Sequence, residues 1–339
     1  MLGDLAFFGL VAAVLTAVWR FVSPRLKVAK LTERFVVITG CDSGFGRAAA
    51  LRLQSRGLKV IATCLTPSGL KSLQDEAARN GPGSVQCVLL DLTKADDVDK
   101  AVAAIKAIVG ERPLHALLNN SGVLKGGMVD AMPISDWQVQ LDVNVLGIAR
   151  MTKPLIPLLF RGDGESRIIN VASVAGVFAT EGTCSYNASK FAVVGVTDAL
   201  HRELRPWGIQ VAMILPGIMK TELWRAPLSA ESQQRSFDSL SPEQKAFYGG
   251  PSFFARAFDE ARSLVDLVAG DPERVVDAME ELCTCKFVAT RRYVGHDTWA
   301  FRLLAALPDV VSDALWAARH HALKTKPVLP KAVEDRQQK

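Results

Sequence analysis

The chain has 339 residues, of which 49% are hydrophobic and 22% are charged, and its formal net charge is +5. This length fits one large α/β domain with extensions, and the apolar content supports a sizeable core and contact with a membrane. The modest charge, with no basic run interleaved with aromatic residues, argues against a nucleic-acid-binding protein. The sequence shows no internal repeats and no low-complexity linker.

Residues 5–22 form an almost wholly apolar run that is interrupted only by Thr16 and Arg20. An 18-residue helix spans about 27 Å, close to the hydrocarbon core of about 30 Å, which predicts a single N-terminal membrane anchor. A cleaved signal peptide is less favoured, because no basic stretch precedes the run and no small-residue cleavage site follows it. A buried core helix is the other alternative. Basic residues between 20 and 30 predict that the rest of the chain faces the cytosol.

An apolar strand expected at 35–38 leads into a glycine-rich turn, and a helix-forming segment at 47–54 follows. Glycines allow a close approach to a ligand, and the helix N-terminus offers free N–H groups to a dinucleotide pyrophosphate. The spacing is Gly-x-x-x-Gly-x-Gly, and the alternative is a glycine loop without a ligand. The residues of this turn are Thr39, Gly40, Cys41, Asp42, Ser43, Gly44, Phe45 and Gly46.

Strands and helices are expected to alternate as far as residue 215. Pro154 and Pro157 should bend or end the helix in which they lie. The alternation predicts an α/β protein with a doubly wound parallel sheet, the Rossmann fold, and ligands at the carboxyl ends of its strands. Strands are predicted at 59–64, 85–90, 116–118, 168–171 and 211–215, and helices at 70–79, 101–109, 134–160 and 188–204.

Three polar residues predict a proton-transfer site for an alcohol. Tyr186 and Lys190 are spaced i, i+4, so they share one face of a helix. A phenol has a pKa of about 10, and a nearby lysine cation and an oxidised nicotinamide ring both favour its ionised form. Ser173 follows a strand, where its hydroxyl can hold the substrate oxygen. Taken alone, Tyr-x-x-x-Lys would indicate an ordinary amphipathic helix and the serine a turn residue.

These motifs resemble those of the short-chain dehydrogenase/reductase family, over about residues 33–294. The resemblance implies that Tyr186 is the general acid/base and that Lys190 lowers its pKa and binds the nicotinamide ribose. It implies that Ser173 orients the substrate oxygen, that Asn144 holds a water relay, and that Ser121 replaces a usual alanine. The implied cofactor-binding residues are Thr39, Gly40, Asp42, Ser43, Gly44, Phe45, Gly46, Asp91 at the adenine, Leu92, Asn119 of the Asn119-Asn120-Ser121-Gly122 motif, Tyr186, Lys190, Pro216, Gly217, and Thr221 at the carboxamide.

Further motifs are similar to the microsomal retinol and hydroxysteroid dehydrogenases. This resemblance implies an oxidoreductase of the endoplasmic reticulum membrane that interconverts a lipophilic alcohol and its carbonyl, with lipid contact and a homo-oligomeric state. A mitochondrial 3-hydroxybutyrate dehydrogenase and a catalytically silent membrane-anchored binding protein remain alternatives. The motifs are Cys64-Leu65-Thr66-Pro67-Ser68-Gly69, Tyr248-Gly249-Gly250 and Arg292-Tyr293-Val294-Gly295.

The sequence favours NAD over NADP as the cofactor. No lysine or arginine lies after the second strand to accept a 2′-phosphate, and Asp42 would repel one. No metal site is expected, because the histidines lack ligand spacing and Cys283 and Cys285 have no His/Cys cluster around them. The six cysteines are expected to be free thiols.

The expected domain organisation has three parts: an anchor with a basic segment at 1–30, a Rossmann domain at 31–296, and a C-terminal membrane-associating extension with a polar tail at 297–339. Within the domain, residues 219–265 should cover the substrate. The alternative is that their aromatic side chains only pack in the core. These are Phe237, Phe247, Phe253, Phe254 and Phe258.

Overall fold

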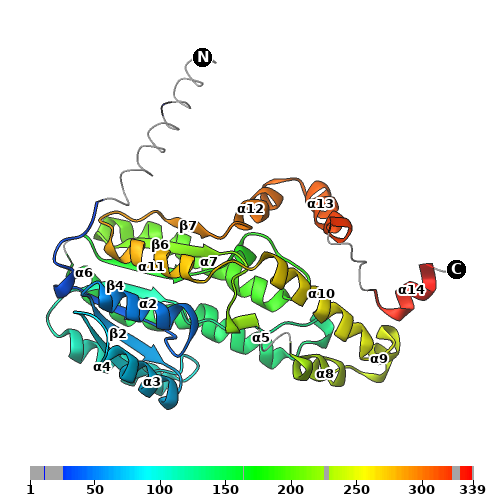
Figure 1. Cartoon of the computed structure of the whole chain (residues 1–339), viewed down its shortest axis with the longest axis horizontal. Helices are drawn as coiled ribbons and strands as arrows, with labels where there is room; N and C mark the ends of the chain where they lie inside the picture. The colour runs from blue at the N-terminus through cyan, green and yellow to red at the C-terminus, as the bar shows by residue number, and fades with distance from the viewer. Residues whose placement is uncertain (1–10, 12–25, 163, 225–228, 323–328, 338–339) are drawn as a thin grey trace.

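The computed structural model describes residues 11, 26–162, 164–224, 229–322 and 329–337. Its centre is a parallel sheet with the strand order β3-β2-β1-β4-β5-β6-β7 (Figure 1). The chain winds outward in both directions from β1 and β4, so the predicted doubly wound Rossmann sheet is confirmed. The strands are β1 Phe35–Ile38, β2 Lys59–Cys64, β3 Ser84–Leu89, β4 Leu114–Asn119, β5 Arg167–Val171, β6 Gln210–Pro216 and β7 Arg291–Val294.

Helices cover both faces of the sheet (Figure 1). On one face, α2 and α11 pack against each other and against the strands, whereas α4, α6 and α7 cover the opposite face. The helices are α2 Gly44–Ser55, α3 Pro67–Ala77, α4 Ala95–Val109, α5 Ile134–Leu141, α6 Gly147–Phe160, α7 Cys184–Leu204, α8 Ala230–Asp238, α9 Pro242–Tyr248, α10 Ser252–Val268, α11 Glu273–Thr284, α12 Thr298–Ala306, α13 Asp309–Ala322 and α14 Lys331–Gln337.

The central strands are buried on both faces, which explains their continuous apolar sequences. Every residue of β1, β4 and β5 is buried, whereas the edge strand β3 alternates between exposed and partly buried positions. Parallel strands under two layers of helices have this pattern. The edge strand β7 was not expected, because its sequence Arg291–Val294 begins with two exposed arginines.

The long helix predicted at 134–160 is interrupted, but its prolines do not end it. Helix α6 contains Pro154 and Pro157 and continues to Phe160. The irregularity comes earlier, in a π-helical segment at Asp142–Leu146 that joins α5 to α6 and carries the buried Asn144. Such π-helical turns are frequent at functional sites.

The helices between β6 and α11, together with those after β7, lie beside the sheet. Helices α8, α9 and α10 follow β6, and α12 and α13 follow β7 and lie above α10 in Figure 1. The aromatic side chains of α9 and α10 form a small core of their own with Ala131 and Leu240. All six cysteines are free, as predicted.

Candidate active site

The glycine turn adopts a conformation that only glycine accommodates readily. Gly40 has φ +71° and Gly44 has φ +57°, both in the left-handed region where a side chain costs energy. At Gly46, an added Cβ would lie 2.2 Å from the carbonyl oxygen of Gly40 and 2.5 Å from the side chain of Asn120. The turn and α2 are therefore in direct backbone contact, which leaves no room for a larger residue at Gly46.

Asn120, which follows β4, binds the glycine turn through side-chain hydrogen bonds. Its Nδ2 donates to the carbonyl oxygens of Thr39 at 2.9 Å and Gly40 at 3.1 Å. In return, the Thr39 hydroxyl accepts the backbone N–H groups of Asn120 and Ser121, each at 3.0 Å. An added Cβ at Gly40 would lie 2.9 Å from the Ser121 Oγ, so there is no room for a side chain at Gly40. Asn120 was missing from the predicted site, although it stands beside Asn119 in the quoted motif.

The N-terminus of α2 fits the pyrophosphate of a dinucleotide. Its cap residue, Ser43, has extended backbone angles, and its side chain makes no capping hydrogen bond. The first N–H groups of a helix lack intrahelical partners and bind anions well. A cavity of about 710 Å³ opens in front of them, lined by Gly44 and Phe45 on one side and Thr221 on the other. The predicted phosphate-binding turn and Thr221 thus meet at one cleft.

Asp42 belongs to the glycine turn after β1, and its carboxylate lies beside the end of β2. A dinucleotide-binding fold holds the adenosine ribose at this place. Its carboxylate accepts hydrogen bonds from the N–H groups of Leu65 at 2.7 Å and Thr66 at 3.0 Å, and from the Thr66 hydroxyl at 2.8 Å. The turn therefore supplies the anion that the sequence after β2 lacks. Arg47 is a nearby cation, but Glu76 holds it in an ion pair at 2.6 Å.

Asp91 lies after β3 and forms a local turn. Burial opposes its ionisation, but hydrogen bonds from Thr93 and the proximity of Lys94 lower the pKa of Asp91 below its ordinary value. Lys94 lies 3.1 Å from the carboxylate. A role for Asp91 at the adenine remains a prediction.

Two predicted cofactor residues direct their side chains into the protein. The Nδ2 of Asn119 donates to Asn170 of β5 at 2.8 Å and to Thr152 of α6 at 3.2 Å. Leu92 packs in the core, and an added Cβ at Gly147 would lie 2.8 Å from its Cδ1. These residues hold the sheet and α6 together, and Asn120, not Asn119, contacts the glycine turn.

At the other end of the cleft, Ser173 and Tyr186 line the same cavity. Ser173 follows β5 and caps a short 3-10 helix, where its Oγ accepts the N–H of Ala175 at 3.1 Å. Tyr186 lies in the first turn of α7, and Lys190 lies one turn later, as the spacing predicted. The Lys190 Nζ is 5.6 Å from the centre of the Tyr186 ring and donates to the Val171 carbonyl at 3.0 Å.

Burial controls the protonation of both groups in the protein alone. It raises the pKa of Tyr186 to about 12, although the hydrogen bond with Ser173 lowers it. Burial also lowers the pKa of Lys190 to about 8. In the protein alone, desolvation therefore sets the direction of the Tyr186 pKa shift, and a lowering of this pKa by Lys190 remains a prediction. The charge of an oxidised nicotinamide ring would favour ionisation of Tyr186.

Asn144 lies in the π-helical segment and is fully buried. Its Oδ1 accepts the N–H of Val123 at 2.8 Å, and its Nδ2 donates to the Val123 carbonyl and to the Ser189 hydroxyl, each at 2.9 Å. An added Cβ at Gly122 would be 3.5 Å from both the Asn144 Oδ1 and the Lys190 Nζ. The structure thus brings Asn144 close to Lys190. Its predicted role in a water relay remains a prediction.

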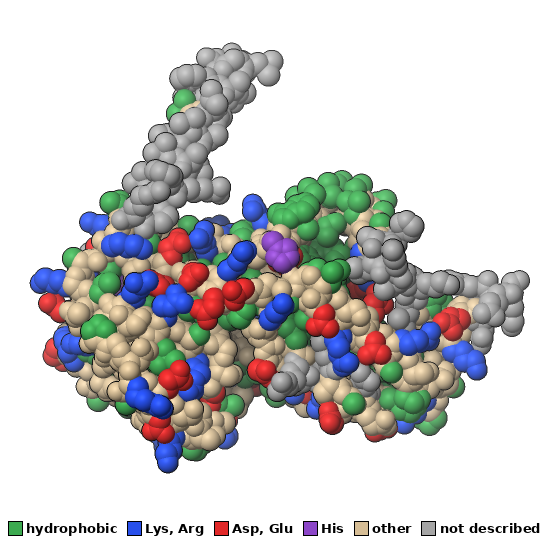
Figure 2. All heavy atoms as spheres, viewed as in Figure 1, with side chains coloured by type: hydrophobic (Ala, Val, Ile, Leu, Met, Phe, Trp, Pro, Cys, Tyr) green, Lys and Arg blue, Asp and Glu red, His purple; other side chains and the backbone are tan. Residues whose placement is uncertain are grey.

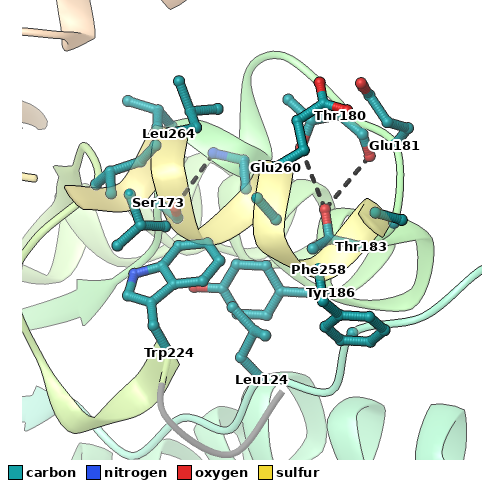
Figure 3. A pocket seen from close by; sticks show the side chains of 18 of the residues that line it. Leu124, Ser173, Thr180, Glu181, Thr183, Tyr186, Trp224, Phe258, Glu260 and Leu264 are labelled. Carbon is teal, nitrogen blue, oxygen red and sulfur yellow. Dashed lines mark hydrogen bonds between the residues drawn. The ribbon is translucent and has the colours of Figure 1, made fainter. Parts of the chain in front are cut away.

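The hydroxyls of Ser173 and Tyr186 face a cavity of about 290 Å³ (Figure 3). Most of its lining side chains are apolar. Phe254, Phe258 and Leu264 come from α10, which fits the predicted covering segment. Phe253 packs in the small core, whereas Phe247 is exposed, so the aromatic residues serve both of the expected purposes. Trp224 lines this cavity and also the cleft in front of α2, so the two adjoin.

The C-terminal extension supplies one wall of the cavity, which the sequence did not indicate. Phe301 of α12 and Trp316 of α13 line it. Both rings contact Phe178, with centroid distances of 6.2 Å and 5.5 Å. The side chains of Glu181, Glu260 and Arg319 also line the cavity. Sequence alone gave no signal for these residues, because they come from three distant segments.

The arrangement matches a known family. The profile of the short chain dehydrogenase family matches residues 34–232. Dehydrogenase/reductase SDR family member 9 of Bos taurus is 36% identical over 86% of this chain and 89% of its own length. Retinol dehydrogenase 7 of Rattus norvegicus is 35% identical over 87% of this chain and 92% of its own length. 17-beta-hydroxysteroid dehydrogenase type 6 of Rattus norvegicus is 33% identical over 88% of this chain and 92% of its own length.

A solved structure shares the fold. A short-chain dehydrogenase from Streptomyces avermitilis superimposes with a TM-score of 0.65 over 87% of this chain and 98% of its own, at 23% sequence identity. The glycine turn, the helix N-terminus and the cleft fit a nicotinamide cofactor, which supplies or accepts the hydride when bound. The chain therefore belongs to the short-chain dehydrogenase/reductase family, as a nicotinamide-dependent alcohol dehydrogenase.

Proposed function

We propose that this enzyme interconverts a lipophilic alcohol, a retinol or a hydroxysteroid, and its carbonyl compound. The observation that carries the proposal is the cavity, where two hydroxyls, those of Ser173 and Tyr186, face a space lined mainly by apolar side chains. Burying apolar surface contributes about 25 cal/mol per Å², so such a cavity favours a ligand that is apolar outside its reacting group. The relatives named retinol dehydrogenase 7 and 17-beta-hydroxysteroid dehydrogenase type 6 support this assignment.

The site residues divide the proton chemistry between them. Ser173 holds the substrate oxygen by a hydrogen bond, and the Tyr186 hydroxyl accepts the alcohol proton during oxidation or donates one during reduction. The Lys190 ammonium is buried beside the tyrosine ring and favours its ionised form. Asn144 fixes the loop at Val123, next to Lys190.

The two alternative functions have less support. A short hydroxy acid needs a cation for its carboxylate, and the candidates were Arg225, Arg235 and Lys245. Arg225 lies outside the described residues, and neither Arg235 nor Lys245 is among the described residues that line the cavity. A silent binding protein would not need the close grouping of Ser173 and Tyr186.

We propose NAD as the preferred cofactor, because the Asp42 carboxylate occupies the ribose end of the cleft. Its charge would repel a 2′-phosphate. Asp42→Asn should raise the efficiency with NADP relative to NAD about tenfold, and Asp96→Asn, an exposed carboxylate on α4, is the matched control. Steady-state kinetics with both cofactors measure this ratio. An unchanged ratio in Asp42→Asn would contradict the assignment.

We further propose that the enzyme is bound to the endoplasmic reticulum membrane with its catalytic domain in the cytosol, and that the mitochondrial membrane is the alternative. The expected anchor at 5–22 lies outside the described residues. Supporting the C-terminal part of the proposal, α12 and α13 expose apolar side chains that form a patch in Figure 2, including Trp299, Leu303, Val310 and Leu315. Deleting residues 1–25 should release the protein from membranes at least partly, as carbonate extraction would show.

In the described part of the chain, one helical stretch is long and apolar enough to cross a membrane. It is Ile134–Phe160, with a mean hydropathy of 1.3. Its C-terminal half, α6, buries Met151, Leu155 and Leu159 against the sheet, so it acts as a core helix of the domain.

The decisive experiment is a substrate screen with the full-length protein in detergent. Retinol, a steroid alcohol and 3-hydroxybutyrate are compared with NAD and with NADP under matched conditions. The lipophilic alcohols should have the higher kcat/KM. A preference for 3-hydroxybutyrate would move the enzyme to the alternative function, and no turnover of any alcohol would favour the silent binding protein.

A further inference from the structure

A group of charged side chains lines one part of the largely apolar substrate cavity. It consists of Glu181 from the segment before α7, Glu260 from α10 and Arg319 from α13. Arg319 donates a hydrogen bond to the Glu181 carboxylate and lies 3.9 Å from the Glu260 carboxylate. Trp316 donates from its Nε1 to Glu181 at 2.8 Å. Three segments distant in sequence thus meet at one polar point, which we call the distal cluster.

The Glu181 end of the distal cluster lies away from the reacting groups. In Figure 3, Ser173 and the Tyr186 hydroxyl lie toward the left of the view, whereas Thr180 and Glu181 lie at the upper right. The hydroxyls of Thr180 and Thr183 contact each other at 3.2 Å within their loop. The charged groups of the distal cluster are therefore the main polar partners for the far end of a ligand.

Attachment of α13 alone does not require these charges. Phe178, Phe301 and Trp316 already pack together and join the C-terminal extension to the domain. The Arg319 and Glu260 side chains are only 17% and 19% exposed, and burial lowers the pKa of Arg319 below its ordinary value. Glu181, the closest partner of Arg319, is 54% exposed, and an ion pair with an exposed partner contributes little to stability. Packing of α13 therefore does not explain why charged side chains line the cavity, whereas binding of a polar ligand group does.

Arg319 keeps donors for a ligand. A guanidinium has five N–H donors. Among the described residues, Arg319 donates to the Glu181 carboxylate and, at 2.9 Å, to the Trp316 carbonyl. Its other donors can bind an incoming oxygen. An uncharged hydroxyl or keto oxygen can accept such a hydrogen bond.

We propose that Arg319, with Glu181 and Glu260, binds a second oxygen at the end of the substrate remote from the reacting carbon. This inference rests on the proposed function and narrows it. The preferred substrate is then a rigid polycyclic alcohol with oxygen functions at both ends, as in a hydroxysteroid with a second hydroxyl or keto group. Retinol has one oxygen, so its binding gains nothing from Arg319.

The test compares two steroids that differ only at the far end, androstanediol with two oxygens and androstanol with one. Binding to the full-length protein in detergent is followed by tryptophan fluorescence, since Trp224 and Trp316 line the cavity. We expect about 10- to 100-fold tighter binding of androstanediol, the usual range for a hydrogen bond to a charged group. Arg319→Met should bring this ratio close to one and leave the affinity for androstanol nearly unchanged.

The control is Arg302→Met, an exposed arginine of α12 that stacks on Tyr293 outside the cavity. It should keep the wild-type ratio. If Arg319→Met does not fold, Arg319→Lys provides the test, because it keeps the charge and loses the planar donor fork, and the ratio should fall. Thermal unfolding verifies the fold of each variant.

Three outcomes overturn the inference: equal binding of the two steroids by the wild type, an equal loss for both in Arg319→Met, or no binding of either steroid. The second would mean that the distal cluster only attaches α13. Turnover is measured separately, so the two proposals fail in different ways. A protein that shows the binding ratio but oxidises no alcohol refutes the proposed function and keeps the inference.

Discussion

The cofactor cleft and the substrate cavity adjoin at Trp224, but they are built in different ways. The phosphate end of the cleft is the glycine turn after β1, where backbone groups are in close contact, and the segment after β6 and helix α10 line its other side. The cavity is lined by side chains from segments that lie far apart in the sequence, such as those of Leu124, Phe254 and Trp316. A turn made of closely packed backbone groups tolerates few substitutions, whereas a single substitution in a cavity lined by side chains can change which ligand it binds.

Tyr186 lines the substrate cavity, and removal of its hydroxyl should have the largest effect. Tyr186→Phe deletes the ionisable oxygen and keeps the ring. We expect kcat to fall by about 10²- to 10⁴-fold, the range of general acid/base catalysis, with cofactor affinity unchanged. Steady-state kinetics and cofactor titration measure the two quantities. Tyr293→Phe, outside the cavity, is the control, and near-normal turnover of Tyr186→Phe would refute the assignment.

The next largest effect is expected in the backbone-built region. Gly46→Ala places a Cβ 2.2 Å from the Gly40 carbonyl oxygen, which forces the turn to move. Overpacking of this kind costs about 1–3 kcal/mol, equivalent to a loss of about 5- to 150-fold in cofactor affinity. Gly195→Ala on α7 is the matched control, because a Cβ there has no described atom within 4 Å. Equal cofactor affinity in the two variants would contradict this account of the turn.

The pH dependence should separate oxidation from reduction. Burial raises the pKa of Tyr186 to about 12 in the protein alone, so the ionised form that accepts the alcohol proton is scarce at neutral pH and increases as the pH rises. Below the pKa of the tyrosine, kcat/KM for oxidation should rise about tenfold per pH unit. Reduction uses the protonated form and should not rise. A flat profile for oxidation would exclude Tyr186 as the base.

Lys190 should add a second feature to the pH profile of oxidation. Burial lowers the pKa of Lys190 to about 8, so its ammonium loses its proton as the pH passes that value and its support for the ionised tyrosine declines. The slope for oxidation should therefore decrease above about pH 8. Lys190→Met should remove this change of slope.

The smallest effect is expected in the side-chain region. Trp316→Leu removes one aromatic wall of the cavity and its contacts with Phe178 and Phe301. Aromatic pairs contribute about 0.5–1.5 kcal/mol beyond the area that they bury, so the KM of a lipophilic alcohol should rise about 2- to 12-fold with little change in kcat. Trp299→Leu, on the exposed face of α12, should leave KM unchanged. A fall in kcat alone would contradict a role in binding.

The same contrast explains how far the sequence predicted the site. Gly40, Gly44 and Gly46 were predictable because a short turn between a strand and a helix sets its own geometry. Tyr186 and Lys190 were predictable because one helical turn separates them. Asn120 was not predicted, because the sequence does not show which of two adjacent asparagines directs its side chain to the glycine turn. The place of Asn119 at the cofactor remains a prediction.

The sequence by itself determined the doubly wound sheet, the phosphate-binding turn and the order of the polar residues, because alternating apolar strands and helices pack in few ways. Only the tertiary structure decided that Asn120 binds the glycine turn, that burial raises the pKa of Tyr186, and that α13 carries Arg319 to the substrate cavity. Desolvation and long-range contacts depend on which segments meet in space. No local spacing in the chain encodes the meeting of Glu181, Glu260 and Arg319.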